Sequence, residues 1–441
     1  MKQTHLFKDF FQYTTFNVLG MIGLSCYILA DTFFIAKGLG ANGLAALNLA
    51  IPVYSFIHGC GLMIGMGGAT RFSILKGQKK MDHTNSYFTC TVYLALMLSA
   101  VYMLLGCFFS KQITSLLGAD ATVFQMTNTY LKVDLFFAPA HLLNDVMLCF
   151  VRNDGRPKLS MQAMLMGSIS NIILDYIFIF PLQMGIFGAV LATGLAPVIS
   201  LLTLSSHWFQ KKNTFHLKKT KPAFSMVRSI LSLGFPSLVA EVSSGIVMIV
   251  FNTIILHLEG NVGVAAYGVI ANISLVVIAV YTGIAQGIQP LISSAYGQFN
   301  QTAMKQILRY ALSTMAVVSS LLYLLLFFFA GPITAAFNSE KNIRLQQIAE
   351  AGLKLYFLAA LFVGFNIVIS MFFTASDHAL PAHMISLLRG LILIIPMAFL
   401  LSYFGGLTGI WLSFPVTEGL TAIFGMMMYL RLYLFSPNRK E

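Results

Sequence analysis

Residues 43–78 read GLAALNLAIPVYSFIHGCGLMIGMGGATRFSILKGQ, and residues 263–298 read GVAAYGVIANISLVVIAVYTGIAQGIQPLISSAYGQ. The two stretches align without a gap, begin with the same Gly-x-Ala-Ala motif and end with the same Gly-Gln. Two shorter matches follow in the same order, because residues 153–157 resemble residues 376–381 and residues 185–188 resemble residues 406–409. We infer an internal duplication of two halves, which serves either transport between the halves or stability alone.

Long apolar segments surround these stretches and fill most of the chain. Hydrophobic residues make up 57% of the sequence and charged residues only 10%, whereas about a quarter of a typical soluble domain is charged. At roughly 20 residues for each spanning helix, the sequence predicts an all-α integral membrane protein with about twelve transmembrane helices. The expected spans are 10–36, 43–74, 86–109, 122–151, 159–181, 186–208, 226–257, 263–294, 306–330, 346–373, 384–404 and 407–431.

The duplication divides the spans into two sets of six. An even number of spans gives both halves the same orientation in the membrane, so we expect parallel repeats related by an axis along the membrane normal. The expected organisation is an N-terminal six-helix lobe at 1–208, a cytoplasmic basic linker at 209–224 and a C-terminal six-helix lobe at 225–441. Two parallel lobes that rock around a central cavity suit transport by alternating access.

The net charge of +12 is distributed unevenly. Basic residues that flank transmembrane helices concentrate on the cytoplasmic side. We therefore interpret the surplus as a topology signal rather than as a nucleic-acid surface, with both termini in the cytoplasm. With the N-terminus in the cytoplasm, 21 of the 27 Lys and Arg are expected on the cytoplasmic side of the membrane. The six expected on the opposite side are Lys37, Lys111, Lys132, Lys341, Arg344 and Lys354.

Asp175 lies near the middle of the apolar run at 159–181. A carboxylate at that depth costs about 2.5–3.5 kcal/mol on insertion scales, so it normally faces an internal cavity and is functional. Asn171 lies four residues earlier on the same helical face. The pair indicates a cation or proton site, and the alternative is a hydrogen-bonded pair that only holds two helices together.

Asp31 and Thr193 supply further oxygen atoms near the same depth. Asp31 lies toward the outer end of the first span, and Thr193 lies about as far beyond the turn at 181–185 as Asp175 lies before it. Two carboxylates, an amide and a hydroxyl suit a hard cation such as Na⁺, and the same set can hold a proton. The coupling ion is therefore Na⁺ or H⁺, and we expect no other cofactor.

Two other polar residues in the spans allow more than one interpretation. Tyr27, one turn before Asp31, is a possible hydrogen-bond donor to either acid, or a tyrosine of the membrane interface. Glu241 in the seventh span is a possible second cation-attracting acid, a substrate ligand or a hydrogen-bonded core acid.

The remaining polar residues of the spans have simpler expected roles. We expect Asp145 to pair with Arg152, and Asp134 to reach the interface beside Lys132. His58 and His141 are expected to be satisfied core residues, since no metal-binding spacing occurs.

Four motifs, LADTFFI at 29–35, FVRNDGRP at 150–157, NIILD at 171–175 and QGIQP at 286–290, together resemble the multidrug and toxic compound extrusion (MATE) family. The resemblance covers nearly the whole chain. It implies a V-shaped antiporter of the cell membrane that exports amphipathic, often cationic organic compounds in exchange for Na⁺ or H⁺. Such an antiporter would act in multidrug efflux and antibiotic resistance, and we expect it to be a monomer. The implied cation site falls on Asp31, Asn171, Asp175 and Thr193.

The chain departs from the family pattern in two respects. Glu241 lies about one turn nearer to Pro236 than expected and the tenth span has no acid at mid-depth, so we expect no second coupling site in the C-terminal lobe. The first span has no proline, so Gly20 and Gly23 would have to provide any bend.

A flippase for lipid-linked precursors, built on a related two-lobed fold, is the alternative function. It would be favoured by additional helices or by a cavity lined with several arginines, and Arg71 and Arg389 are both expected near the cytoplasmic side. An enzyme is not expected, because no nucleophile–base pair or metal-binding constellation occurs.

Overall fold

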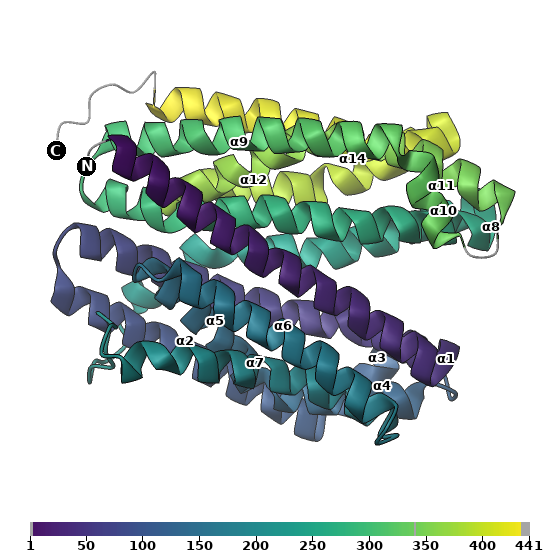
Figure 1. Ribbon diagram of the computed structural model, residues 1–441, viewed down its shortest axis with the longest axis horizontal. Helices are drawn as coiled ribbons and strands as arrows, with labels where there is room; N and C mark the ends of the chain where they lie inside the picture. The colour runs from purple at the N-terminus through teal and green to yellow at the C-terminus, as the bar shows by residue number, and fades with distance from the viewer. Residues whose placement is uncertain (1–2, 339–340, 434–441) are drawn as a thin grey trace.

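The computed structural model describes residues 3–338 and 341–433, and it is helical throughout these two ranges apart from short turns and the segment before Phe224. Figure 1 shows two layers of helices, one formed by α1–α7 and the other by α8–α14, which we call the N-terminal and C-terminal lobes. The helices are α1 (Gln3–Gly77), α2 (Met81–Phe108), α3 (Ser110–Leu116), α4 (Phe124–Phe136), α5 (Ala138–Asn153), α6 (Pro157–Ile179), α7 (Gly185–Phe209), α8 (Phe224–Gly297), α9 (Gln301–Phe328), α10 (Ala330–Phe337), α11 (Ile343–Tyr356), η1 (Phe357–Ala359), α12 (Ala360–Ala375), α13 (Ala379–Leu387), the π-helical turn η2 (Leu388–Ile392) and α14 (Ile394–Tyr433).

The longest helix, α1, reverses direction at Gly40. Gly40 has φ 68° and ψ −160°, a left-handed backbone that favours glycine. The hydroxyls of Tyr27 and Tyr54 lie 2.9 Å apart, although 27 residues of straight helix would separate them by about 40 Å. The two parts of α1 are therefore an antiparallel helix pair, as the first two expected spans require.

The second half of the chain repeats this reversal. Gly260 in α8 has φ 65°, and the rings of Phe251 and Tyr267 on either side of it lie 5.5 Å apart. Gly406 in α14 has φ 53° and divides the last two spans. Gly185, its counterpart in the first half, has φ 63° at the start of α7.

These reversals confirm the predicted number of spans. In the described ranges, eight helical segments are long and apolar enough to cross a membrane, and α4 with α5, bent by 49°, forms a ninth. Three of the nine turn back at Gly40, Gly260 and Gly406, so together they supply twelve spans.

The lobes meet at the end of the molecule that carries Gln3, Gly77 and Gly297, which we call the base. We call the opposite end, with Gly40 and Gly260, the rim. Figure 1 shows α1 crossing from the C-terminal lobe at the base to the N-terminal lobe at the rim. Consistent with this path, Leu6 and Phe10 are buried in the hydrophobic core of the C-terminal lobe.

Glycines allow the backbones of the two lobes to touch at the base. A Cβ atom on Gly67 would overlap the carbonyl oxygen of Ile230, and one on Gly234 would overlap that of Met63. Small residues permit such close helix packing in membranes, where dispersion contacts replace the hydrophobic effect between helices. This contact fixes the second part of α1 against the start of α8.

The segment expected as a linker, 209–224, is docked on the N-terminal lobe. Phe215 is fully buried, with ring centroids 4.6 Å from Phe88 and 5.5 Å from Phe150. The segment therefore packs into the core of the N-terminal lobe and is not merely a connection between the lobes.

An ion cluster around Asp154 holds the same segment. Its carboxylate accepts hydrogen bonds from Lys76 at 2.5 Å, His207 at 2.9 Å and the backbone of Thr214 at 2.8 Å. Burial raises the pKa of Asp154, but these bonds outweigh burial and hold the pKa below its ordinary value. The cluster therefore stabilises the docked segment fully at pH values above the ordinary pKa of an aspartate. This stabilisation is lost as the pH falls through the lowered pKa of Asp154.

Replacing Gly234 with alanine is expected to loosen the base. The added Cβ overlaps the backbone of Met63, and overpacking of this kind typically costs about 1–3 kcal/mol. We expect a lower unfolding midpoint for purified Gly234→Ala protein in detergent. Gly245→Ala is the matched control on the same helix, because nothing lies within 4 Å of its added Cβ. Equal midpoints for the two variants would contradict the close packing of the lobes.

Candidate cation site in the N-terminal lobe

The structure brings together the four residues predicted to form the cation site. Asp31 comes from α1, Asn171 and Asp175 come from α6, and Thr193 comes from α7. Asn171 and Asp175 have no exposed surface, and Asp31 and Thr193 are buried as well. The site is therefore enclosed within the N-terminal lobe, away from the surface that contacts the C-terminal lobe.

The hairpin of α6 and α7 sets the depth of the site. The chain leaves α6 after Ile179 and re-enters a helix at Gly185, whose positive φ makes the tight turn. Asp175 and Thr193 lie at similar distances from this turn, so they lie at similar depth on the two helices of the hairpin. Asn171 lies one helical turn deeper, on the same face as Asp175.

The two carboxyl groups of Asp31 and Asp175 lie within hydrogen-bonding distance of each other. The Oδ1 atom of each is buried and has no hydrogen-bond partner in the described ranges. Two adjacent buried carboxylates repel each other unless a proton or a cation lies between them. The unpaired oxygens therefore fit either Na⁺ or a proton.

Asn171 holds Asp175 in place. With its amide oriented to satisfy both neighbours, its nitrogen donates to Oδ2 of Asp175 at 3.0 Å and its oxygen accepts from the backbone N–H of Thr193 at 3.2 Å. The amide oxygen is thus engaged by the protein. We therefore interpret Asn171 as a positioning residue, whereas the sequence suggested a direct oxygen ligand.

Tyr130 on α4 completes the site and was missed by the sequence analysis. Its side chain is buried, its hydroxyl contacts Thr193, and it lies near Asp31. The signal that would have found it is a polar face on one helix, because Asp134 follows Tyr130 by four residues.

The hydroxyl of Tyr27 pairs with another tyrosine and not with either acid. Its hydroxyl forms a 2.9 Å hydrogen bond with Tyr54. Tyr54 in turn stacks on His58, with ring centroids 6.1 Å apart and an interplanar angle of 10°. Tyr27 therefore belongs to a chain of aromatic side chains that leads from the first span toward the C-terminal lobe.

That chain ends in a second cluster of ionisable groups. Nδ1 of His58 lies 3.0 Å from Oδ2 of Asp145, and Glu241 from the C-terminal lobe lies close enough to interact electrostatically with both. The β-carbon of Glu241 packs against Gly59. Glu241 is therefore placed between the lobes, facing an acid–histidine pair of the other lobe.

One predicted pairing and one predicted position were wrong. Asp145 pairs with His58, while Arg152 donates to Asn17 and to Gln286 at 2.7 Å each. Asp134 does not reach the interface; it is fully buried, with Oδ1 lying 3.3 Å from Nε2 of His141. His58 and His141 therefore each lie beside a buried carboxylate and are not isolated residues of the core. The physical reason is that neighbouring helices, which local spacing does not encode, bring closer partners.

The C-terminal lobe buries a different kind of acid, Glu418, which the sequence analysis did not single out. Its Oε1 accepts from Arg389 at 2.8 Å, and its Oε2 accepts from Asn366 at 2.7 Å. Arg389 reaches it from the π-helical turn η2. Glu418 is therefore neutralised by a fixed cation of its own lobe.

A family model described as MatE matches residues 18–177 and 236–400, one part in each lobe. The multidrug export protein MepA of Staphylococcus saprophyticus is 27% identical over 430 residues, which covers 97% of this chain and 94% of that protein. MepA of Staphylococcus aureus is 26% identical over 429 residues, with the same two coverages.

Solved structures confirm the predicted fold. A multidrug resistance MATE family transporter of the MOP superfamily, in an outward-facing conformation, matches with a TM-score of 0.90 and 22% identity over 97% of each chain. A MOP superfamily transporter from Pyrococcus furiosus matches with the same TM-score and identity, over 99% of this chain and 98% of that chain.

Replacing Asn171 with leucine is expected to weaken cation binding without removing a charge. The variant loses the donor to Asp175, and a hydrogen bond to a charged group contributes about 1.5–3 kcal/mol. We expect the half-saturating cation concentration to rise by about tenfold or more. The measurement is the unfolding midpoint of purified protein as a function of NaCl concentration and, separately, of pH.

Asn272→Leu provides the control, since Asn272 is exposed on α8 of the other lobe. If both variants keep the cation dependence of the unaltered protein, Asn171 does not position the site.

Proposed function

The chain belongs to the MatE family, and on that premise we propose that it is a secondary active antiporter that exports amphipathic, often cationic organic compounds. Export would be driven by Na⁺ or H⁺ that enters the N-terminal lobe. The observation that carries this proposal is the buried pair Asp31 and Asp175, whose Oδ1 atoms have no protein partner in the described ranges. The names of the MepA relatives support multidrug compounds as the substrate class.

The first helix provides a physical route from cation binding to movement of the lobes. Asp31 contacts Asp175 inside the N-terminal lobe. Nearer the base, the backbone of Thr14 and Val18 lies so close to Gly287 and Gly283 of α8 that a Cβ on either glycine would overlap it. A proton or cation between the acids changes the forces on α1, which touches both lobes, and so biases their relative position.

The charge distribution supports an orientation of the chain in the membrane. We propose that the base, with both termini, faces the cytoplasm of a cell whose plasma membrane the twelve spans cross, because 21 of the 27 Lys and Arg fall on the base side of the predicted spans and six on the other. Export then requires the lobes to separate alternately at the base and at the rim. We propose that a single copy of the chain performs this cycle.

Glu241 is proposed to attract cationic substrates to the space between the lobes. It faces His58 and Asp145 across the interface, and no Lys or Arg of the described ranges forms an ion pair with it, whereas Glu418 pairs with Arg389. The lipid-precursor flippase is not favoured, since the described residues supply no spans beyond the twelve and the matching curated relatives are named multidrug export proteins.

Replacing Asp175 with asparagine is expected to abolish coupled export. The measurement is efflux of a cationic dye from proteoliposomes under an imposed Na⁺ gradient and, separately, an imposed H⁺ gradient. Only one of the two gradients should drive efflux in the unaltered protein, and neither should drive it in Asp175→Asn. Asp120→Asn is the matched control, because Asp120 is exposed at a turn. Undiminished gradient-driven efflux by Asp175→Asn would overturn the proposed coupling site.

Replacing Glu241 with glutamine is expected to weaken the binding of cationic substrates more than that of neutral ones. The half-saturating concentration of a monovalent organic cation should rise by about tenfold, equivalent to about 1.4 kcal/mol. A neutral amphipathic compound should be affected much less, and Glu350→Gln in α11 should affect neither. Equal weakening of the cation and the neutral compound would indicate a structural role for Glu241.

A further inference from the structure

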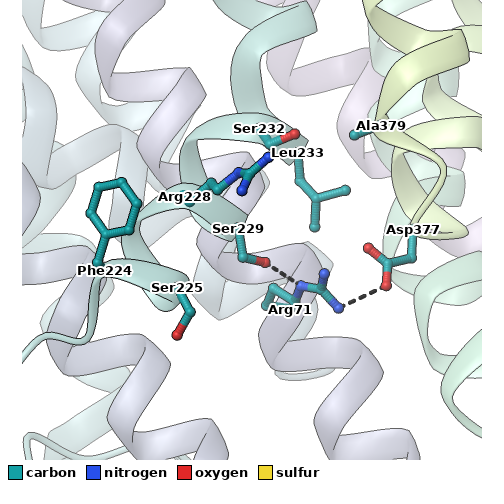
Figure 2. A pocket seen from close by; sticks show the side chains of 9 residues that line it. All are labelled: Arg71, Phe224, Ser225, Arg228, Ser229, Ser232, Leu233, Asp377 and Ala379. Atoms are coloured by element: carbon teal, nitrogen blue, oxygen red, sulfur yellow. Dashed lines mark hydrogen bonds and ion pairs between the residues drawn. The ribbon is translucent and has the colours of Figure 1, made fainter.

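A pocket of about 320 Å³ lies at the base, between the two lobes. Figure 2 shows that Arg71 of α1 enters it from the N-terminal lobe, while the other walls come from the C-terminal lobe. Those walls include the first two turns of α8 and the turn around Asp377, before α13. The pocket is remote from the acids of the cation site, which lie within the N-terminal lobe nearer to the rim.

Arg71 joins the two lobes across this pocket. Its Nη1 atom donates to Oδ2 of Asp377 at 2.8 Å, and its Nε atom donates to the hydroxyl of Ser229 at 2.5 Å. Both partners belong to the C-terminal lobe, and Figure 2 marks both bonds. Separation of the lobes at the base requires both bonds to break.

The pocket carries an excess of positive charge. Arg71 and Arg228 both line it, and Asp377 is the one acid among its lining residues. Arg228 forms no hydrogen bond or ion pair with another residue of the described ranges, and its side chain is exposed to solvent. One guanidinium charge of the pocket is therefore left without a protein counterion.

The remaining polar groups are suited to a tetrahedral anion. Ser225, Ser229 and Ser232 line the same walls, and the hydroxyl of Ser229 already contacts Arg71. A guanidinium has five N–H donors, of which Arg71 uses two in the bonds described above. Guanidinium pairs with added hydroxyl donors are a frequent arrangement for phosphate recognition.

We propose that this pocket binds a phosphate-bearing anion, either the phosphate of an anionic lipid headgroup or free phosphate. The anion bridges Arg71 of one lobe and Arg228 of the other. Because its ligands come from both lobes, it binds more tightly when the base is closed than when the lobes separate. By linkage, the occupied pocket stabilises the base-closed arrangement and slows reopening of the base.

Thermal unfolding of the purified full-length protein in nanodiscs tests the site. In phosphatidylcholine nanodiscs, inorganic phosphate is titrated against sodium chloride at equal ionic strength. In a second arm, nanodiscs that contain phosphatidylglycerol are compared with phosphatidylcholine nanodiscs without phosphate. A rise in the unfolding midpoint in the first arm identifies free phosphate as the ligand, and a rise in the second arm identifies the lipid headgroup.

Arg228→Gln removes the unpaired charge without touching the bonds of Arg71. It should raise the half-saturating phosphate concentration, or lower the response to phosphatidylglycerol, by at least tenfold. Arg309→Gln is the control, because Arg309 is an exposed arginine near the base of the same lobe and outside the pocket. The proposal is overturned if neither ligand raises the midpoint, or if the two variants respond equally.

Closure of the base is measured separately. Spin labels at positions 79 and 305 report the distance between the lobes, because Lys79 and Lys305 are exposed near the base of opposite lobes. The exposed cysteines Cys26 and Cys107 are first replaced with serine. The ligand identified above should increase the short-distance population, and it should fail to do so in Arg228→Gln. An unchanged distance distribution in the presence of that ligand would overturn the linkage to closure.

Discussion

A hydrocarbon environment offers no partners to polar groups, so each one within the spans needs a partner inside the protein. This constraint accounts for the helical backbone and for the way ionisable side chains meet. His58 pairs with Asp145, and His141 lies beside Asp134. Arg152 donates to two amide oxygens, one from each lobe. Because these two bonds together span the interface, the partners of one buried charge also join the lobes.

The same constraint is met differently for the buried acids of the two lobes. The buried acid of the C-terminal lobe, Glu418, is held by Arg389, a cation that cannot leave. Asp31 and Asp175 in the N-terminal lobe lie against each other and keep one unpaired oxygen each. The fixed counterion supports a structural role for Glu418, whereas the unpaired oxygens of Asp31 and Asp175 support the proposed site for an exchangeable ion.

The sequence predicted the features that depend on spacing along the chain. The count of twelve spans follows from apolar length, the duplication from the match of residues 43–78 with 263–298, and the common depth of Asp175 and Thr193 from their equal distances to a turn. The features that it missed depend on contacts between helices distant in sequence. Tyr130 and Glu418 were overlooked, and the partner of Asp145 was misassigned, because no local pattern says which neighbouring helix will lie closest.

The docking of residues 209–224 determines how the lobes are joined. Phe215 is buried in the N-terminal lobe, and the backbone of Lys218 still donates to Thr89 of α2. Only residues 219–223 then lead to the start of α8. A tether this short gives each lobe an effective concentration of roughly millimolar at the other. Contacts at the base can therefore be individually weak and still re-form after every opening, which lets the closed arrangement be both readily broken and reliably restored.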